Sequence, residues 1–180
     1  MLKALVEHGV EPDLIVGTSI GAINGALFAA SPNEHGVAAL ERSWMNLEFR
    51  DLFPGSLWNR ARAAVQQRTY LHTNDQLRSW LTDRLELTDI EDLPLSFQCV
   101  AARIEDASEH WFTSGPLVDA LLASSAVPGL LPPVVVNGMH YVDGGVVNSI
   151  PLSRALECGA TTIFVLHVGH IDDVLEVPTR

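Results

Sequence analysis

Apolar residues along the chain occur in two patterns, as short continuous runs and as residues repeated at helical spacing. Short runs bounded by glycine, proline or aspartate are typical of buried strands, and the longer repeats are typical of helices packed on one face. The runs predict strands over residues 14–16, 95–102 and 161–168, and a hairpin over residues 134–142 that turns at Asn137 and Gly138. The repeats predict helices over residues 2–9, 20–30, 38–47, 57–67, 74–85, 117–124 and 150–158.

The order of these elements indicates a fold of the α/β class, because strands alternate with helices along the chain. The chain opens with a strand, a tight turn and a helix within residues 14–30. A length of 180 residues suits one domain, and we find no internal repeat or linker. We therefore expect a single domain over residues 1–170 and an acidic tail over residues 171–180.

The amino-acid composition and net charge exclude some classes of binding partner. The chain has 11 Lys+Arg and 22 Asp+Glu, which gives a net charge of -11. So acidic a protein lacks the basic surface that nucleic acids require, and anionic membranes repel it. The two cysteines, Cys99 and Cys158, form neither a disulfide framework nor a CxxC pair, which favours a reducing compartment such as the cytoplasm. The uncharged run over residues 14–33 is rich in glycine and polar residues, which favours a strand, turn and helix over a membrane span.

One motif has the pattern of a nucleophile elbow. Residues 17–21 read G-x-S-x-G, with Ser19 at the centre, between an apolar strand and an amphipathic helix. In such an elbow the serine occupies a strained turn, and glycines flank it because side chains there would collide with the strand and the helix. Gly17 and Gly21 fill those positions, and the helix N-terminus favours developing negative charge. The alternative is a glycine-rich packing turn whose serine caps the helix.

A serine nucleophile needs a base, and Asp143 is the candidate. It follows a short apolar strand and precedes Gly144 and Gly145, which would let the carboxylate approach another element closely. An aspartate shielded from water can accept the serine proton. The alternative is an Asx-type turn, for which the pair Asp-Gly is a common signal.

Together these two motifs resemble those of the patatin-like phospholipases. The resemblance rests on residues 10–30 and 120–151, which hold the two motifs in the order and at the separation of that family. It implies a three-layer α/β/α sandwich with a mostly parallel central sheet. It also implies a Ser–Asp dyad that hydrolyses acyl esters of lipids without a metal or organic cofactor, with Ser19 as nucleophile and Asp143 as general base. Further positions match the family's pattern: residues 124–129, Asn148 and Pro151.

One part of the family's site has no counterpart in this sequence. The family's glycine-rich oxyanion loop and first strand precede the helix predicted over residues 2–9. The backbone N–H of Ile20 then remains as an oxyanion donor, and loss of one donor costs about 2.7–4 kcal/mol. The elbow strand also keeps an unpaired edge, which favours self-association. We expect either that Met1 is an internal residue of a longer protein, or that the chain is a catalytically weak domain that binds acyl lipid or a partner chain.

Other chemistries match the sequence less well. A triad of the α/β-hydrolase type would add His167 or His170 to the dyad, but too few residues precede the elbow for the strands of that fold. A histidine within the predicted strand of residues 161–168 is more commonly a core residue. A metal site built from these histidines with Asp172 and Asp173 matches no strong zinc pattern, and the elbow lacks the lysine of a P-loop.

An aromatic-rich stretch over residues 44–58 precedes Arg60, Arg62 and Arg68. One interpretation is a helical lid whose apolar face contacts acyl chains or a membrane interface. The other is a helical layer packed on the sheet. In the first case the partners of the chain are a lipid or other acyl ester and, transiently, a membrane surface.

Overall fold

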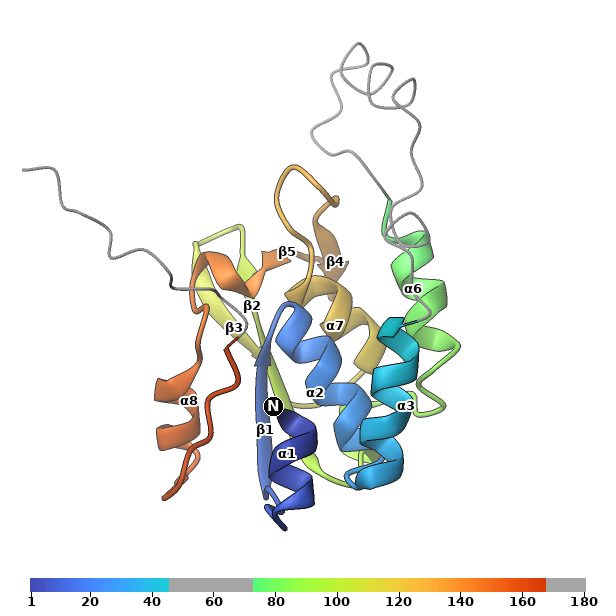
Figure 1. Cartoon of the computed structure of the whole chain (residues 1–180). Coiled ribbons are helices and arrows are strands. Elements are labelled where there is room, and N and C mark those ends of the chain that lie inside the picture. The colour runs from blue at the N-terminus through green and yellow to red at the C-terminus, as the bar shows by residue number, and fades with distance from the viewer. Residues whose placement is uncertain (46–72, 168–180) are drawn as a thin grey trace, which may run out of the picture.

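The computed structural model describes residues 1–45 and 73–167 (Figure 1). Its helices are α1 (Leu2–Glu7), α2 (Ile20–Ala30), α3 (Glu34–Met45), α6 (Asp75–Thr82), α7 (Leu117–Ser124) and α8 (Leu152–Glu157). Its strands are β1 (Leu14–Thr18), β2 (Ser96–Arg103), β3 (Ser108–Phe112), β4 (Val134–Val136) and β5 (Met139–Asp143). Two short 3-10 helices are η1 (Ile90–Asp92) and η2 (Gly144–Val146). The predicted helix over residues 57–67 and the tail over residues 171–180 lie outside the described residues.

Strand β2 lies at the centre of the sheet. β1 pairs in parallel with residues 96–100 of β2, and β3 pairs antiparallel along the opposite edge. β5 pairs antiparallel with residues 101–103 on the same edge as β1, and β4 extends the sheet as the hairpin partner of β5. β1 and β5 therefore meet end to end along one edge of β2. The described sheet is mixed, because only the β1–β2 pair is parallel, so the expectation of a mostly parallel sheet is wrong for these strands.

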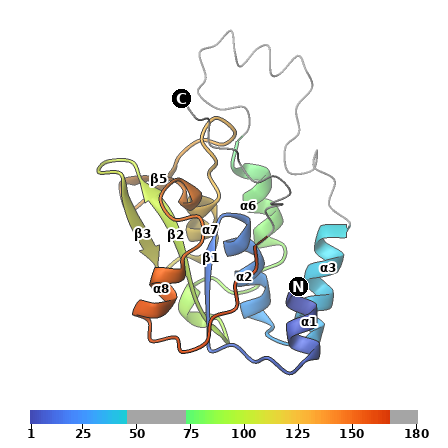
Figure 2. The same cartoon turned by 60° about the vertical axis from the view of Figure 1, so that its left-hand side comes forward.

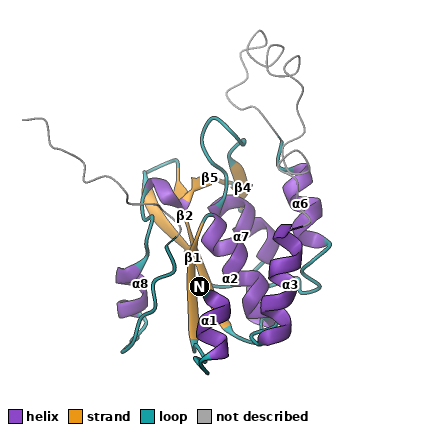
Figure 3. Ribbon diagram, viewed as in Figure 1, coloured by secondary structure: helices purple, strands orange, loops and turns teal. Residues whose placement is uncertain are grey.

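Helices cover both faces of this sheet, which confirms the α/β class (Figures 1 and 3). α8 lies on one face, and the other α-helices lie on the opposite face. The side chains of β2 alternate between the two layers. Cys99 Sγ lies 3.8 Å from the carbonyl oxygen of Ala120 in α7, whereas Gln98 accepts a hydrogen bond from Arg154 Nε of α8 at 2.8 Å. The layers agree with the expected α/β/α order.

The hydrophobic core lies between the sheet and helices α2, α6 and α7. α2 approaches the sheet closely because its inner face is made largely of small residues. A Cβ at Gly25 would come within 2.7 Å of Ile15 Cγ2, so only glycine fits there without a shift. α7 contributes Leu117, Leu121 and Leu122, which are completely buried. This packing fixes the N-terminus of α2 and the C-terminus of α7, where the candidate site lies.

Most predicted elements form at or near the predicted residues. The helix over residues 117–124 coincides with α7, and the run of residues 14–33 forms β1, a turn and α2. The hairpin turns at Asn137 and Gly138, whose φ angles of 51° and 79° are those that a two-residue hairpin turn requires. Within residues 1–45 and 73–167, no helix has both the length and the apolar character needed to cross a bilayer.

The last predicted strand does not form in the described residues. Residues 161–167 are irregular, and Phe164, Val165 and Leu166 are 55%, 47% and 46% exposed. Figure 2 shows this stretch on the β1 side of the sheet. A strand needs a hydrogen-bonding neighbour, and no described strand pairs with this segment or with the outer edge of β1. The prediction is therefore wrong, and His167 is exposed rather than part of the core.

The same open edge leaves β1 less buried than a strand covered on both faces and both edges. Its apolar residues 14–16 are half-buried, against the expectation of full burial. The structure also contains a strand that the sequence pattern does not predict, β3, which pairs with β2 over residues 108–112. Charged residues in the preceding turn interrupt the apolar pattern that would predict this strand. Ala107 closes that turn with a φ of 55°.

Candidate active site

The candidate nucleophile and base meet because two strands end at neighbouring residues of β2. Thr18, the last residue of β1, pairs with Val100 of β2. Asp143, the last residue of β5, pairs with the next residue, Ala101. β1 and β5 run toward each other, so the turn after β1 begins where β5 ends. The topology thus places Ser19 beside Asp143, although 124 residues separate them in sequence.

The turn at Ser19 has the backbone of a nucleophile elbow. Ser19 has a φ of 54°, a value that residues other than glycine rarely adopt, and α2 begins at the next residue. A Cβ at Gly17 would lie 2.5 Å from the Ala22 Cα, so this position excludes any side chain. A Cβ at Gly21 would meet nothing within 4 Å among the described residues. The predicted collision at the flanking glycines is thus confirmed for Gly17 and wrong for Gly21.

The hydroxyl of Ser19 donates a hydrogen bond to Asp143 Oδ2 at 2.5 Å. The Ser19 side chain makes no capping bond to α2, so the interpretation of this serine as a helix cap is wrong. The second carboxylate oxygen, Asp143 Oδ1, accepts the N–H of Gly145 at 2.7 Å. The carboxylate therefore forms the Asx-type turn and the contact to Ser19 at once, one with each oxygen.

Burial and backbone contact define the environment of this pair. Asp143 is 6% exposed, whereas Ser19 is half-buried and thus reachable from outside. A Cβ at Gly144 would lie 2.2 Å from the carbonyl oxygen of Val100, and one at Gly145 would lie 2.9 Å from Asp143 Oδ1. Gly144 therefore allows the turn to rest against β2, and Gly145 leaves room for the Asp143 carboxylate.

The N-terminus of α2 lies directly behind the serine. The carbonyl of Ser19 accepts the N–H groups of Ala22 and Ile23, which starts the helix. The N–H of Ile20 makes no hydrogen bond to another described residue, so it is free to face a ligand. The positive end of the helix dipole adds to its attraction for negative charge. An N–H without a partner among the described residues is what the expected role of Ile20 as oxyanion donor requires.

Two other segments hold the elbow, one through a backbone carbonyl and one through a side chain. Thr18 Oγ1 donates to the carbonyl oxygen of Asn148 at 3.0 Å, and the N–H of Ser19 donates to Ser124 Oγ at 3.0 Å. The sequence resemblance includes Asn148 and Ser124, but the motifs alone assign neither of them a contact to the elbow. The sequence signal that points to Ser124 is the pair Ser124 and Ser125, because these two serines end a helix with a wholly apolar face.

The remaining candidate residues do not join this site. His167 lies in the exposed segment after α8, and no described histidine contacts Asp143. His170, Asp172 and Asp173 lie outside the described residues. Most of the aromatic stretch over residues 44–58 also lies outside them. Its first residue packs on the helical layer: the Trp44 indole donates to Asn24 Oδ1 at 2.6 Å, and its ring lies 5.5 Å from that of Trp80.

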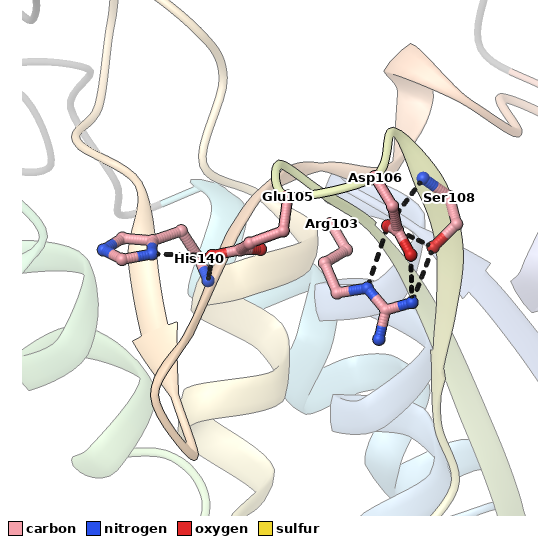
Figure 4. A network of polar contacts seen from close by, with 5 residues as sticks. All are labelled: Arg103, Glu105, Asp106, Ser108 and His140. Carbon is pink, nitrogen blue, oxygen red and sulfur yellow. Dashed lines mark hydrogen bonds and ion pairs between the residues drawn. The ribbon is translucent and has the colours of Figure 1, made fainter.

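A separate polar cluster anchors the start of β5 (Figure 4). At the turn between β2 and β3, Glu105 accepts hydrogen bonds from the backbone N–H of His140 at 2.9 Å and from its ring Nδ1 at 2.8 Å. Beside it, Asp106 pairs with Arg103 and accepts the hydroxyl of Ser108 at 2.7 Å. The contact to His140 lowers the pKa of Glu105, and the contact to Arg103 lowers the pKa of Asp106. The cluster is exposed and lies outside the candidate site.

The α/β fold agrees with what comparison with known proteins shows. The family model of the patatin-like phospholipases matches residues 1–156. The chain belongs to the patatin-like phospholipase family. This patatin-like chain is 31% identical to a patatin-like phospholipase domain-containing protein of Caenorhabditis elegans, over 96% of the chain and 12% of that protein.

Two fungal proteins are also similar to the patatin-like chain. Lysophospholipases of Kluyveromyces lactis and Aspergillus terreus are 29% and 30% identical to it over 96% of its length. The aligned region covers 12% and 11% of those two proteins. The chain thus spans about an eighth of the length of the curated relatives it matches.

Proposed function

We propose that this chain is a serine acyl hydrolase that cleaves carboxylic esters of lipids, with Ser19 as nucleophile and Asp143 as general base. The observation that carries the proposal is the 2.5 Å hydrogen bond from Ser19 Oγ to Asp143 Oδ2, at a serine with a positive φ. Membership of a phospholipase family and similarity to lysophospholipases support a lipid ester as substrate.

The mechanism follows from the two carboxylate contacts. Asp143 Oδ2 takes the Ser19 proton as Oγ attacks the ester carbonyl, while the N–H of Gly145 keeps Oδ1 in place. The Ile20 N–H stabilises the oxyanion of the tetrahedral intermediate. When that intermediate collapses, the leaving alcohol takes the proton from Asp143 and the acyl group stays on Ser19. Asp143 then removes a proton from the water that attacks the acyl-enzyme, and returns it to Ser19 as the fatty acid leaves.

Apolar side chains around the dyad support transient contact with a lipid surface. Ile20 follows the nucleophile, Val146 lies in the turn after Asp143, and Val127 follows the α7 C-terminus; they are 42%, 62% and 40% exposed. With a net charge of -11, the chain gains nothing from attraction to anionic lipid, so contact would rest on these apolar groups. A lipid aggregate reached from a reducing compartment is the site of action that we propose.

The second candidate function is that of a catalytically weak domain that binds acyl lipid or a partner chain. The outer edge of β1 favours it, because no strand among the described residues pairs with that edge and another strand can pair there. That strand would come either from a preceding segment of a longer protein, together with further oxyanion donors, or from a second copy of the chain.

Labelling with a fluorophosphonate probe tests the proposed function. An activated serine attacks phosphorus and expels fluoride, so the labelled fraction counts working dyads. We expect Ser19→Ala to abolish labelling and Asp143→Asn to slow it by at least about 100-fold, the contribution of a general base. Ser153→Ala, an exposed serine of α8, is the control that should label at the wild-type rate.

Two outcomes would contradict the proposal. Labelling that persists in Ser19→Ala would place the reactive serine elsewhere. A folded wild-type chain that takes up no label would favour the binding function, which a lipid-binding assay with the same preparation then tests.

A further inference from the structure

The end of α7 contacts the backbone of both dyad residues. Ser124 is the last residue of α7, and its Oγ accepts the N–H of Ser19 at 3.0 Å. Two residues later the carbonyl oxygen of Ala126 accepts the N–H of Asp143, also at 3.0 Å. Ser124 and Ala126 are completely buried. One three-residue segment therefore holds the elbow with a side chain and the base with a carbonyl.

Among the described residues, one further hydrogen bond joins the elbow to the segment after Asp143, from Thr18 Oγ1 to the Asn148 carbonyl oxygen. β1 and β5 each pair with β2, but they do not pair with each other. Ser19 also has a backbone conformation that is costly for a residue with a side chain, so it persists only where its surroundings fix it. A buried acceptor for its N–H supplies that restraint, because a buried N–H without a partner is costly.

We propose that residues 124–126 act as a clamp that sets the distance between Ser19 Oγ and Asp143 Oδ2, and that Ser124 is a positioning residue for the nucleophile. The proposal rests on the dyad function proposed above. The hydrogen bonds of the clamp go to backbone N–H groups, and among the described residues none goes to Ser19 Oγ or to the Asp143 carboxylate. Its loss should therefore misplace the nucleophile without changing which groups exchange the proton.

The adjacent serine provides a matched control. Ser125 is also buried, at 6% exposure, but its hydroxyl has no hydrogen-bond partner among the described residues. Ser124→Ala and Ser125→Ala thus delete the same atom from neighbouring buried positions. Only the first deletion breaks a contact to the elbow, and removal of an unpartnered hydroxyl should leave stability unchanged or improve it.

Fluorophosphonate labelling tests the clamp. Both the rate constant of labelling and the labelled fraction are measured across a pH series. We expect Ser124→Ala to lower the rate constant about tenfold, the effect of one ordinary hydrogen bond, with the labelled fraction and the pH profile unchanged. Ser125→Ala should stay within about twofold of wild type. A Ser124→Ala chain with a smaller labelled fraction but the wild-type rate constant would show a merely structural role and overturn the proposal. Where Ser124→Ala does not fold, Ser124→Cys replaces it, because a thiol is a weak acceptor.

Amide hydrogen exchange tests the same contact without using activity. The Ser19 N–H should exchange slowly in the wild-type chain and in Ser125→Ala, and faster in Ser124→Ala. Exchange of the wild-type Ser19 amide at the rate of an unprotected amide would overturn the clamp. A protected Ser19 amide in a chain that takes up no label would instead uphold the clamp and count against the dyad function.

Discussion

At the scale of single residues, the site depends on glycines at positions where any side chain would collide with the backbone. A Cβ at Gly144 would lie 2.2 Å from the Val100 carbonyl oxygen, and one at Gly17 would lie 2.5 Å from the Ala22 Cα. In both cases the obstacle is backbone, which cannot move aside as the end of a flexible side chain can. Gly21 belongs to the same G-x-S-x-G motif as Gly17, but a Cβ there would face open space among the described residues. The motif therefore combines one glycine that packing requires with one that it does not.

Substitution of these glycines should separate the two cases. Gly144→Ala should lower the free energy of unfolding by about 3 kcal/mol, because the new methyl group overlaps the β2 backbone and has nowhere to go. Gly21→Ala should not lower it, because alanine is the better helix former within α2 and its Cβ meets no described atom within 4 Å. Denaturant unfolding of both variants provides the measurement. Equal midpoints for Gly144→Ala and wild type would contradict the close approach of the Asp143 turn to β2.

At the scale of elements, predictions from the sequence succeed where the signal is local. The periodicity of α7, the Asn137–Gly138 turn and the strand, turn and helix around Ser19 each fix their own conformation over a few residues. The contact between Ser19 and Asp143 requires the register of two strands on β2, which no local pattern contains. The apolar run of residues 161–167 shows the same limit, because strand formation there depends on a neighbour.

The turn between β2 and β3 should make stability depend on pH. In the folded state Arg103 lowers the pKa of Asp106 below its ordinary value of 3.8, and His140 lowers the pKa of Glu105 below its ordinary value of 4.5. The unfolded chain therefore binds more protons in the acid range, and these two groups stabilise the fold above those values and lose that effect as pH falls through the folded pKa values. Because both carboxylates are exposed, we expect a small effect.

Asp106→Asn tests this dependence by urea unfolding at pH 7 and below pH 3. The variant should unfold at a lower urea concentration than wild type at pH 7, and the difference should shrink in acid, where wild-type Asp106 is losing its charge. Asp83→Asn, at the exposed end of α6, removes a charge of the same sign without breaking a contact among the described residues. A difference for Asp106→Asn that stays constant with pH would rule out the ionised carboxylate as its cause.

At the scale of the whole molecule, the acidic charge opposes association, whereas the outer edge of β1, which no described strand covers, favours it. A net charge of -11 keeps copies of the chain apart, more strongly at low salt. The outer edge of β1 and the exposed Phe164, Val165 and Leu166 favour pairing with another strand. Salt screens the charge repulsion but leaves the strand pairing and the apolar contacts unchanged. Association should therefore increase with ionic strength.

We therefore expect the chain to self-associate when salt is raised, and sedimentation velocity over a concentration series measures it. Wild type should move from a species near 19.6 kDa toward a larger one as concentration and salt increase. The double variant Phe164→Ser and Leu166→Ser should remain near the monomer mass, because it removes apolar surface beside the β1 edge without changing net charge. Met45→Ser at the end of α3, where the side chain is 79% exposed, removes a comparable apolar group elsewhere and should associate like wild type.

A wild-type chain that stays at the monomer mass at every salt concentration would show that the edge is closed in solution. An equal loss of association in Met45→Ser would show that general hydrophobicity, rather than the β1 edge, holds the copies together.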